Sequence, residues 1–269
     1  MSNRLRRRLA AREPLLGTWL SFSDPAVAEI GASLGYDFAL IDTEHTPLSL
    51  ETVTELVRAI EAAPGETEAM VRVPWNDPVS LKRVLDTGVG GVMVPMVDTA
   101  EQAREALEAT RYPPEGERRM AAGRAAGYGL DFENYVERAN EEIATIVQIE
   151  SERGVENAEE IAAVEGIDAL FVGPADLSAA LDAFGEPESD AFTAAIDRVI
   201  EAGEATDTPI GTLAIETEEV ETRVEQGFDF LIAGLDAAHL IKGNRRAKRA
   251  YESALDGRED PTDREDREE

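Results

Sequence analysis

The chain has 269 residues, 43% of them hydrophobic, so it is long enough to bury a sizeable core in one large α/β domain. It is strongly acidic, with a net charge of −30, so nucleic acid and anionic membranes are not expected as partners. The absence of cysteine excludes disulfides, thiolate metal sites and cysteine nucleophiles. No apolar run reaches the roughly 18 residues that cross a bilayer, and the basic N-terminal segment lacks a signal peptide's apolar stretch, so we expect a cytoplasmic protein.

Lysine occurs only at positions 82, 242 and 248, whereas arginine is abundant. A dense carboxylate surface with few lysines is typical of halophilic proteins, because concentrated salt screens the repulsion between like charges. We therefore interpret the charge as adaptation to a salt-rich solvent, with no bearing on the substrate.

In chain order, a short amphipathic helix at the N-terminus precedes eight apolar runs that alternate with amphipathic segments. This pattern predicts βαβ units. The predicted strands are 15–22, 38–44, 69–74, 91–97, 145–150, 169–174, 209–215 and 229–234, and predicted helices include 49–63, 77–87, 99–110 and 190–204. Eight such units predict a (β/α)8 TIM barrel whose active site lies at the carboxyl ends of the strands.

Smaller signals support these boundaries. Asp24-Pro25 and Asp77-Pro78 place an aspartate at the N-cap and a proline at the first helical position, and Gly35, Gly88 and Gly227 fall where helices should end. Residues 1–256 are expected to form one barrel domain, with an irregular functional loop at 111–140 after the fourth strand. Residues 257–269, which carry charge without apolar positions, are expected to be a disordered acidic tail.

Polar side chains gather where four of the predicted strands end. These residues are Asp42, Glu44 and His45 at the end of the second strand, Arg72 in the third, Gln148 and Glu150 in the fifth, and Gly173-Pro174-Ala175-Asp176 at the end of the sixth. Strand alternation points Arg72 into the barrel if Val71 and Val73 pack against helices, and a buried arginine needs an anionic partner from the protein or a ligand. Simpler roles remain open, since Asp176 could cap a helix, Glu150 could pair with an arginine, and His45 could be structural.

The sequence resembles the HpcH/HpaI aldolase family, which includes 4-hydroxy-2-oxoheptanedioate aldolase and 2-dehydro-3-deoxyglucarate aldolase. The resemblance is carried by the segments GTWLSFSDPAVAEIGASLGYDFALIDTEH, VRVPWNDPVSLKRVLDTGVGGVMVPMV, RYPPEG, VQIES and FVGPADLS, which span roughly residues 15–236. It implies a barrel of the phosphoenolpyruvate/pyruvate superfamily type. It also implies a class II aldolase that cleaves or forms 4-hydroxy-2-oxo acids, with pyruvate and an aldehyde as the other reactants.

The resemblance also implies roles for individual residues. Glu150 and Asp176 match metal ligands, His45 matches a general base, and Asp86 matches the aspartate that raises its basicity. Arg72 matches the residue that holds the keto acid, and the other substrate-binding positions are Trp19, Gln148, Gly173, Pro174, Ala175 and Asp176. The family forms hexamers, as trimers of dimers that exchange helices, so a homo-oligomer is expected. In one departure, Arg119 and Ala121 replace glycines of the family's R-G-x-G segment.

The few lysines favour one way of stabilising the carbanion that an aldolase forms. It can be stabilised by a lysine Schiff base or as an enolate held by a metal ion, and no lysine lies at a predicted strand end. Two carboxylates suit a hard divalent cation such as Mg²⁺, Mn²⁺ or Co²⁺. Two other functions remain open: a CoA-ester lyase of the citrate lyase β-subunit or malyl-CoA type, which requires basic residues for the CoA phosphates, and a barrel without catalytic activity.

Overall fold

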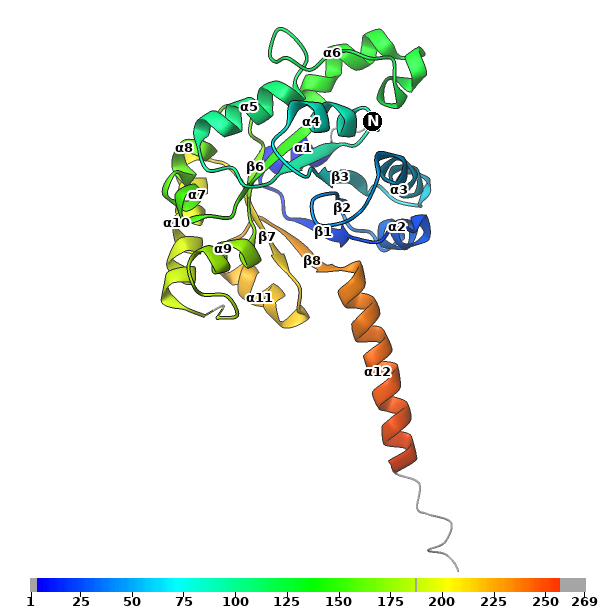
Figure 1. The fold of residues 1–269 in the computed structure, drawn as a ribbon, viewed down its shortest axis with the longest axis vertical. Coiled ribbons are helices and arrows are strands. Elements are labelled where there is room, and N and C mark those ends of the chain that lie inside the picture. Colours follow the sequence, from blue (N-terminus) through cyan, green and yellow to red (C-terminus); the bar gives the residue numbers. More distant parts are fainter. Residues whose placement is uncertain (1–3, 187, 257–269) are drawn as a thin grey trace, which may run out of the picture.

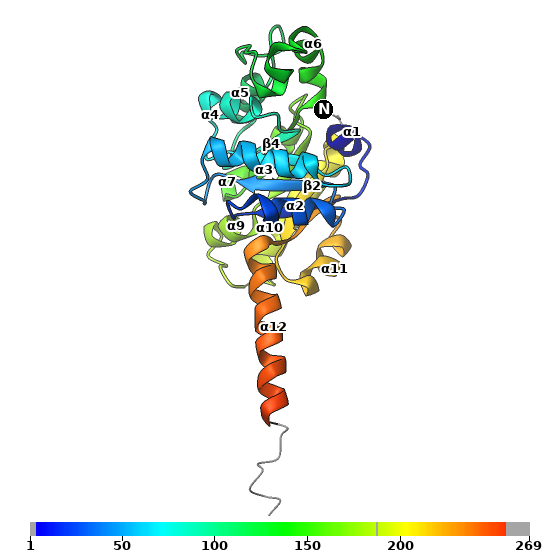
Figure 2. The ribbon, with the colours of Figure 1, turned by 90° about the vertical axis from the view of Figure 1, so that its right-hand side faces the viewer.

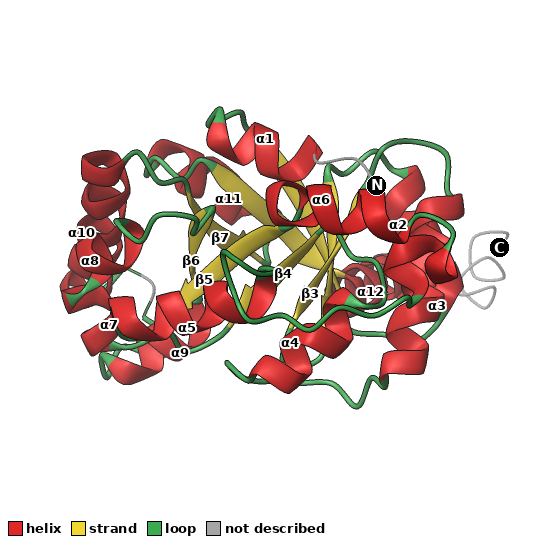
Figure 3. Cartoon of the chain, turned by 90° about the horizontal axis from the view of Figure 1, so that it is seen from above, coloured by secondary structure: helices red, strands yellow, loops and turns green. Residues whose placement is uncertain are grey.

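Eight parallel strands form a closed barrel in sequence order, and helices surround it (Figure 3). The computed structural model describes residues 4–186 and 188–256, so the predicted tail at 257–269 lies outside the described residues. The strands are β1 (Leu15–Leu20), β2 (Phe38–Asp42), β3 (Glu68–Arg72), β4 (Gly91–Val94), β5 (Ala144–Ile149), β6 (Ala169–Val172), β7 (Ile210–Ala214) and β8 (Phe230–Leu235). Each overlaps its predicted counterpart, which confirms the predicted barrel.

Helices precede, connect and follow the strands, and those between successive strands cover the outside of the barrel. They are α1 (Arg4–Ala10), α2 (Pro25–Ser33), α3 (Leu50–Ala62), α4 (Pro78–Leu85), α5 (Ala100–Thr110), η1 (Arg124–Gly129), α6 (Phe132–Glu142), α7 (Glu152–Glu156), α8 (Ala158–Ala162), α9 (Pro174–Ala180), α10 (Asp190–Thr206), α11 (Thr217–Glu225) and α12 (Asp236–Asp256). As predicted, Asp24 and Asp77 cap α2 and α4, where their carboxylates accept hydrogen bonds from backbone amides. Gly35, Gly88 and Gly227 end α2, α4 and α11 with positive φ angles.

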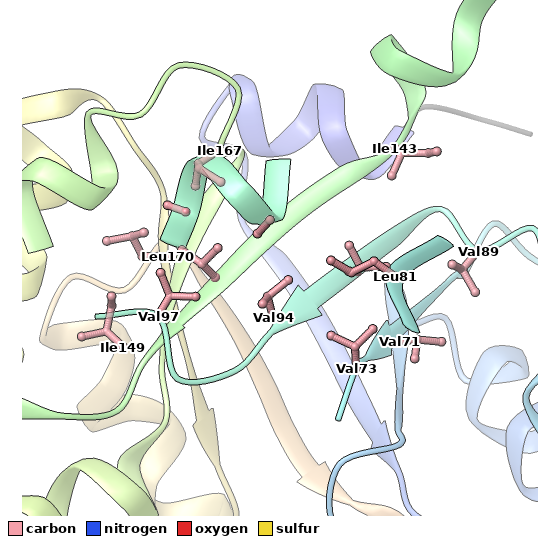
Figure 4. Packing of buried hydrophobic residues seen from close by; sticks show 14 of the residues in the cluster. Val71, Val73, Leu81, Val89, Val94, Val97, Ile143, Ile149, Ile167 and Leu170 are labelled. Carbon is pink, nitrogen blue, oxygen red and sulfur yellow. The ribbon is translucent and has the colours of Figure 1, made fainter. Parts of the chain in front are cut away.

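Alternation along the strands divides the apolar residues between two cores. Met70 of β3 and Ile146 of β5 point into the barrel interior, where they pack with Phe38, Phe171 and Phe230. Val71 and Val73 belong to the outer core between strands and helices, beside Leu81 of α4 (Figure 4). Arg72, between these two valines, therefore faces the interior, as predicted.

The N-terminal helix α1 closes the barrel at the amino ends of its strands. Leu5 and Leu9 insert into the interior core. Arginines of the segment bind three aspartates that directly precede strands: Arg6 with Asp168 at 2.7 Å, Arg12 with Asp229 at 2.9 Å, and Arg8 with Asp37. These aspartates also accept backbone amides of neighbouring strands, from Leu16, Thr145 and Ile210. The basic N-terminal segment is thus a structural part of the barrel.

The last helix, α12, extends away from the barrel and does not pack along its side (Figures 1 and 2). Leu240, Tyr251 and Leu255 on this helix are exposed. An apolar groove of about 370 Å³ lies at its base, between β1, α2 and the start of α12. Phe22, Val27, Ile30, Leu34 and Leu240 are among its lining residues. Within the described residues, no helix is long and apolar enough to cross a membrane.

The prediction of an irregular functional loop at 111–140 is wrong in two respects. Residues Phe132–Glu142 form α6, because Tyr135 and Ala139, one turn apart, are buried, with Tyr135 packed edge-on against Tyr112. The remaining segment connects α5 to β5, so it lies at the amino ends of the strands. It is therefore not at the carboxyl ends of the strands in the same chain, where the active site is predicted. Arg119 and Ala121 are part of this distant segment.

Candidate active site

A cavity of about 510 Å³ opens at the carboxyl ends of the strands. It brings together all the predicted site residues except Asp86: Trp19, His45, Arg72, Gln148, Glu150, Gly173, Pro174, Ala175 and Asp176. They come from β1, β3 and β5 and from the segments that follow β2, β5 and β6, so the barrel topology alone gathers residues that are far apart in the sequence.

Arg72 is the most constrained side chain in the cavity. Its Nε and Nη2 donate to the two carboxylate oxygens of Asp42, each at 2.9 Å, and its Nη1 lies 2.7 Å from Glu44 Oε2. The guanidinium carbon lies 4.5 Å from the centre of the Trp19 ring. The anionic partners that a buried arginine requires are therefore protein carboxylates. A guanidinium has five N–H donors, so this arrangement leaves two for a ligand.

Glu150 is a buried carboxylate that is not paired with an arginine. Its Oε2 accepts the Met96 amide at 3.0 Å, and its Oε1 accepts Gln148 Nε2 at 3.0 Å. Burial raises the pKa of the Glu150 carboxyl to about 7, and the nearby carboxylates of Glu44 and Asp176 act in the same direction. A carboxylate that is so poorly solvated and lies beside other carboxylates would gain from a bound cation.

Two backbone features allow this placement of Glu150. A Cβ at Gly173 would lie 2.3 Å from Glu150 Oε1, so only glycine lets the carboxylate lie against this part of the backbone. Met96 has φ of 53°, an unusual value for a residue with a side chain, and its amide donates to Glu150. Gly173 therefore makes room for Glu150, and it also lines the cavity in which the family resemblance implies substrate binding.

Asp176 lies exposed in the first turn of α9 and makes no hydrogen bond or ion pair with any described residue. The N-cap position of α9 belongs to Gly173, so Asp176 does not cap this helix. Gln148 Oε1 is buried and also lacks a hydrogen-bond partner in the described part of the chain. Across residues 4–186 and 188–256, no three acidic or histidine side chains form a ready-made metal site. Glu150 and Asp176 nevertheless fit a divalent cation that completes its oxygen ligands with substrate and water.

His45 follows β2 at the rim, where its side chain is 66% exposed. Its Nε2 lies 3.9 Å from Glu44 Oε2, and burial raises the pKa of the Glu44 carboxyl against the opposing effects of Arg72 and His45. Within one chain, Asp86 does not lie beside His45. It ends α4 at the amino end of the barrel and binds Arg118 at 3.0 Å, so the expected support of His45 by Asp86 is not present in the single chain.

Sequence reasoning noted Asp42 and Glu44 but gave them no role, and it missed Arg223 and the apolar side of the cavity formed by Phe171 and Leu213. The need of Arg72 for an anionic partner is the available signal for Asp42 and Glu44, because Asp42 ends the neighbouring strand β2 and Glu44 lies two residues later. Arg223 has no comparable signal, since it lies among other charged residues of its helix.

Comparison with known proteins agrees with this geometry. The family model described as HpcH/HpaI aldolase/citrate lyase matches residues 15–243, which include every strand of the barrel. The chain therefore belongs to this family. A hydroxypyruvate/pyruvate aldolase of Paraburkholderia phytofirmans is 41% identical over 251 residues, covering 91% of this chain and 96% of that protein. A 4-hydroxy-2-oxo-heptane-1,7-dioate aldolase of Shigella sonnei is 39% identical, covering 90% and 92%.

Solved structures confirm the likeness of the fold. The crystal structure of an HpcH/HpaI aldolase/citrate lyase family protein from Burkholderia cenocepacia superposes with a TM-score of 0.90 at 38% identity. The match covers 93% of this chain and all of that one.

Replacing Glu150 by Gln should stabilise the metal-free protein at alkaline pH. The pKa of Glu150 is raised to about 7 from its ordinary 4.5, so the folded state binds this proton more tightly than the unfolded state does. The free-energy cost of burying the ionised carboxylate is therefore absent below about pH 4.5 and complete above about pH 7. At about 1.4 kcal/mol per pKa unit, replacing the carboxyl by an amide should raise the free energy of unfolding by up to about 3 kcal/mol at pH 8.

Thermal melts in excess EDTA at pH 8 and pH 5 measure this effect, with Glu152→Gln, an exposed neighbour in sequence, as the matched control. The gain in Tm should be larger at pH 8 than at pH 5. An equal gain at both pH values would show that the carboxyl does not carry this burial penalty.

Proposed function

We propose that this chain is a divalent-cation-dependent aldolase that cleaves and forms 4-hydroxy-2-oxo acids, with pyruvate and an aldehyde as the other reactants. The observation that carries the proposal is the buried Glu150 carboxylate, placed with Asp176 in a cavity that also holds Arg72 and His45. No lysine is found among the described residues that line this cavity, so a Schiff base has no candidate there. The activities of the curated relatives support the same reaction class.

The deep part of the cavity would bind the keto-acid half of the substrate. Glu150 and Asp176 would hold the cation, which when bound supplies positive charge that polarises the substrate carbonyl. The two N–H donors of Arg72 that remain free can bind carboxylate or keto oxygens, and they stabilise the negative charge that develops on cleavage. The fixed bonds to Asp42 hold the guanidinium in place for this role.

At the rim, His45 would move the proton. In the cleavage direction it accepts the proton of the C4 hydroxyl, directly or through a water molecule, as the C3–C4 bond breaks. The aldehyde carbonyl forms, and the bonding electrons pass to the enolate of pyruvate, which then takes up a proton at C3. Glu44 Oε2 lies 3.9 Å from the imidazole Nε2.

Metal binding should require both carboxylates. Glu150→Ala and Asp176→Ala are each expected to abolish measurable Mn²⁺ binding in calorimetry, because each removes one of two protein ligands. Both variants should remain folded, since the two residues lie at the mouth and outside the two apolar cores. Glu152→Ala, which removes an exposed carboxylate next to the site, is the control. Unchanged Mn²⁺ affinity in both site variants would refute the ligand assignment.

The same assignment predicts dependence of turnover on the cation. Pyruvate release from 4-hydroxy-2-oxo acids, measured by a coupled assay, should cease after metal removal and return with Mg²⁺, Mn²⁺ or Co²⁺. Treatment with borohydride and substrate should leave activity intact, because no lysine adduct forms. Full activity in excess EDTA, after verified removal of metal, would exclude the proposed mechanism.

His45→Ala should reduce kcat by roughly 10²–10⁴, the usual range for loss of a general acid–base group. KM should change much less, because Arg72 and the carboxylates still hold the keto acid. His239→Ala is the comparison, since His239 lies on α12 outside the cavity. Steady-state cleavage by both variants at equal metal saturation measures the difference. A greater loss of kcat in the His239 variant would overturn the assignment of the base.

We further propose that the chain works as a homo-oligomer in which α12 of a second copy occupies the open groove beside β1 and α2. Leu240, Ala247, Tyr251 and Leu255 recur at spacings of seven, four and four residues, so they form one stripe along the exposed helix. An exposed apolar stripe and an open apolar groove in the same chain are complementary.

Changing this stripe should therefore dissociate the assembly. In size-exclusion chromatography with light scattering, the wild-type chain should elute as an oligomer, and Tyr251→Glu with Leu255→Glu should shift it to smaller species. Ser253→Glu adds one negative charge on the opposite face of α12 and should leave the assembly intact. A monomeric wild-type chain, or equal dissociation by the control variant, would contradict this proposal.

A further inference from the structure

The helix α11 buries an arginine and leaves the adjacent valine exposed. Arg223 is 6% exposed and is the one buried residue of α11, whose nine residues are all described, whereas the adjacent Val224 is 59% exposed. Burial of a charged group in place of an apolar neighbour opposes folding unless the charge has a partner. A helix that departs from its amphipathic pattern in this way indicates a functional role for the buried charge.

Arg223 has no anionic partner at contact distance. Its Nη1 donates to the amide oxygen of Gln226 at 2.9 Å, and its guanidinium carbon lies 6.0 Å from the centre of the Phe192 ring. Its Nε is buried without a hydrogen-bond partner. In the part of the chain that the structure describes, no carboxylate forms an ion pair with it, and the nearby Glu219 instead accepts the backbone amide of Glu216.

The two arginines that line the active-site cavity thus differ in their charge balance. Arg72 is held by two carboxylates, whereas Arg223 forms no ion pair with a described residue, although Glu219, one turn away on α11, attracts it over a longer distance and also lines the cavity. They also lie on different sides of the cavity. Arg72 belongs to β3, and Arg223 follows β7, four strands further around the barrel. Leu213, Ile215 and Phe192 line the cavity on the Arg223 side.

We propose that Arg223 binds an anionic group on the aldehyde half of the substrate. This inference rests on the proposed aldolase function, in which Arg72, Glu150 and Asp176 hold the keto-acid half. The remaining part of the cavity then receives the aldehyde, which meets apolar side chains and a guanidinium with unused donors. A carboxylate or a phosphate carried by the aldehyde would pair with this guanidinium. On a chain of net charge −30, such a local cation is needed to hold an anionic reactant.

The test compares matched aldehydes in the synthetic direction, with pyruvate in excess. One series pairs aldehydes that end in a carboxylate, OHC–(CH₂)n–COO⁻, with neutral aldehydes of equal length that end in a methyl group. A second pair, glyceraldehyde 3-phosphate and glyceraldehyde, separates phosphate from carboxylate recognition. The proteins are the wild-type chain, Arg223→Gln, Arg223→Lys and the control Arg104→Gln, which removes the same charge from an exposed position on α5.

The wild-type chain should prefer at least one anionic aldehyde over its neutral match. Arg223→Gln should lower kcat/KM for that anionic aldehyde by about tenfold to a hundredfold, the usual size for loss of a buried charge-assisted hydrogen bond. Turnover of the neutral aldehyde should stay within about threefold, since Arg223 contacts only the anionic group. Arg223→Lys should restore part of the preference, because it keeps the charge without the planar fork.

Two outcomes would overturn the inference: a wild-type chain without preference for anionic aldehydes, or an equal loss on both members of a pair in Arg223→Gln. The second outcome would show a structural role, which a lower Tm and no recovery in the Lys variant would accompany. Absence of turnover with every aldehyde in the wild-type chain would instead contradict the proposed aldolase function. The two failures are therefore distinguishable.

Discussion

The ion cluster around Arg72 holds the mouth of this barrel together. Its bidentate pairing with Asp42 joins β3 to β2, its contact with Glu44 fixes the start of the following loop, and its stacking over Trp19 reaches β1. A buried arginine without these carboxylates would be strongly destabilising, so the cluster forms as a unit or not at all. His45 directly follows Glu44, and its position at the rim therefore depends on the same cluster.

Much of the fold could be predicted because it is encoded locally. Apolar runs alternate with amphipathic segments, and local caps such as Asp24 and Asp77 mark where helices begin. These local patterns do not predict at which end of the barrel the 111–140 segment lies. The helix α6 follows a stretch rich in glycine, proline and arginine, and only Tyr135, Ala139 and Asn140 of it are buried, so its position depends on packing against residues distant in sequence. The position of α12 likewise depends on contacts that its own residues do not specify.

The site was predictable where strand ends carry the residues. Gln148 and Glu150 share a face because side chains alternate along β5, and the barrel closure brings them to Asp176. Three features depend on tertiary structure alone: the room that Gly173 leaves for Glu150, the pairing of Asp86 with Arg118, and the burial of Arg223. The Asp86 role had been assigned by resemblance, and the folded chain places this aspartate at the opposite end of its own barrel. Similarity of sequence therefore located most of the residues but not all of their neighbours.

Closure of the barrel floor by α1 constrains the order of events during turnover. Leu5 and Leu9 fill the interior, and the arginines of the segment bind the aspartates around it, so this end offers no exit. Reactants and products must all pass through the one mouth. In the proposed mechanism, the keto-acid half would lie deeper, beside the buried Glu150, whereas the new aldehyde would form near the exposed His45. The aldehyde would then depart first and pyruvate last, so pyruvate would also be the first reactant to bind in synthesis. The N-terminal helix would thereby set a kinetic sequence at a site on the far side of the molecule.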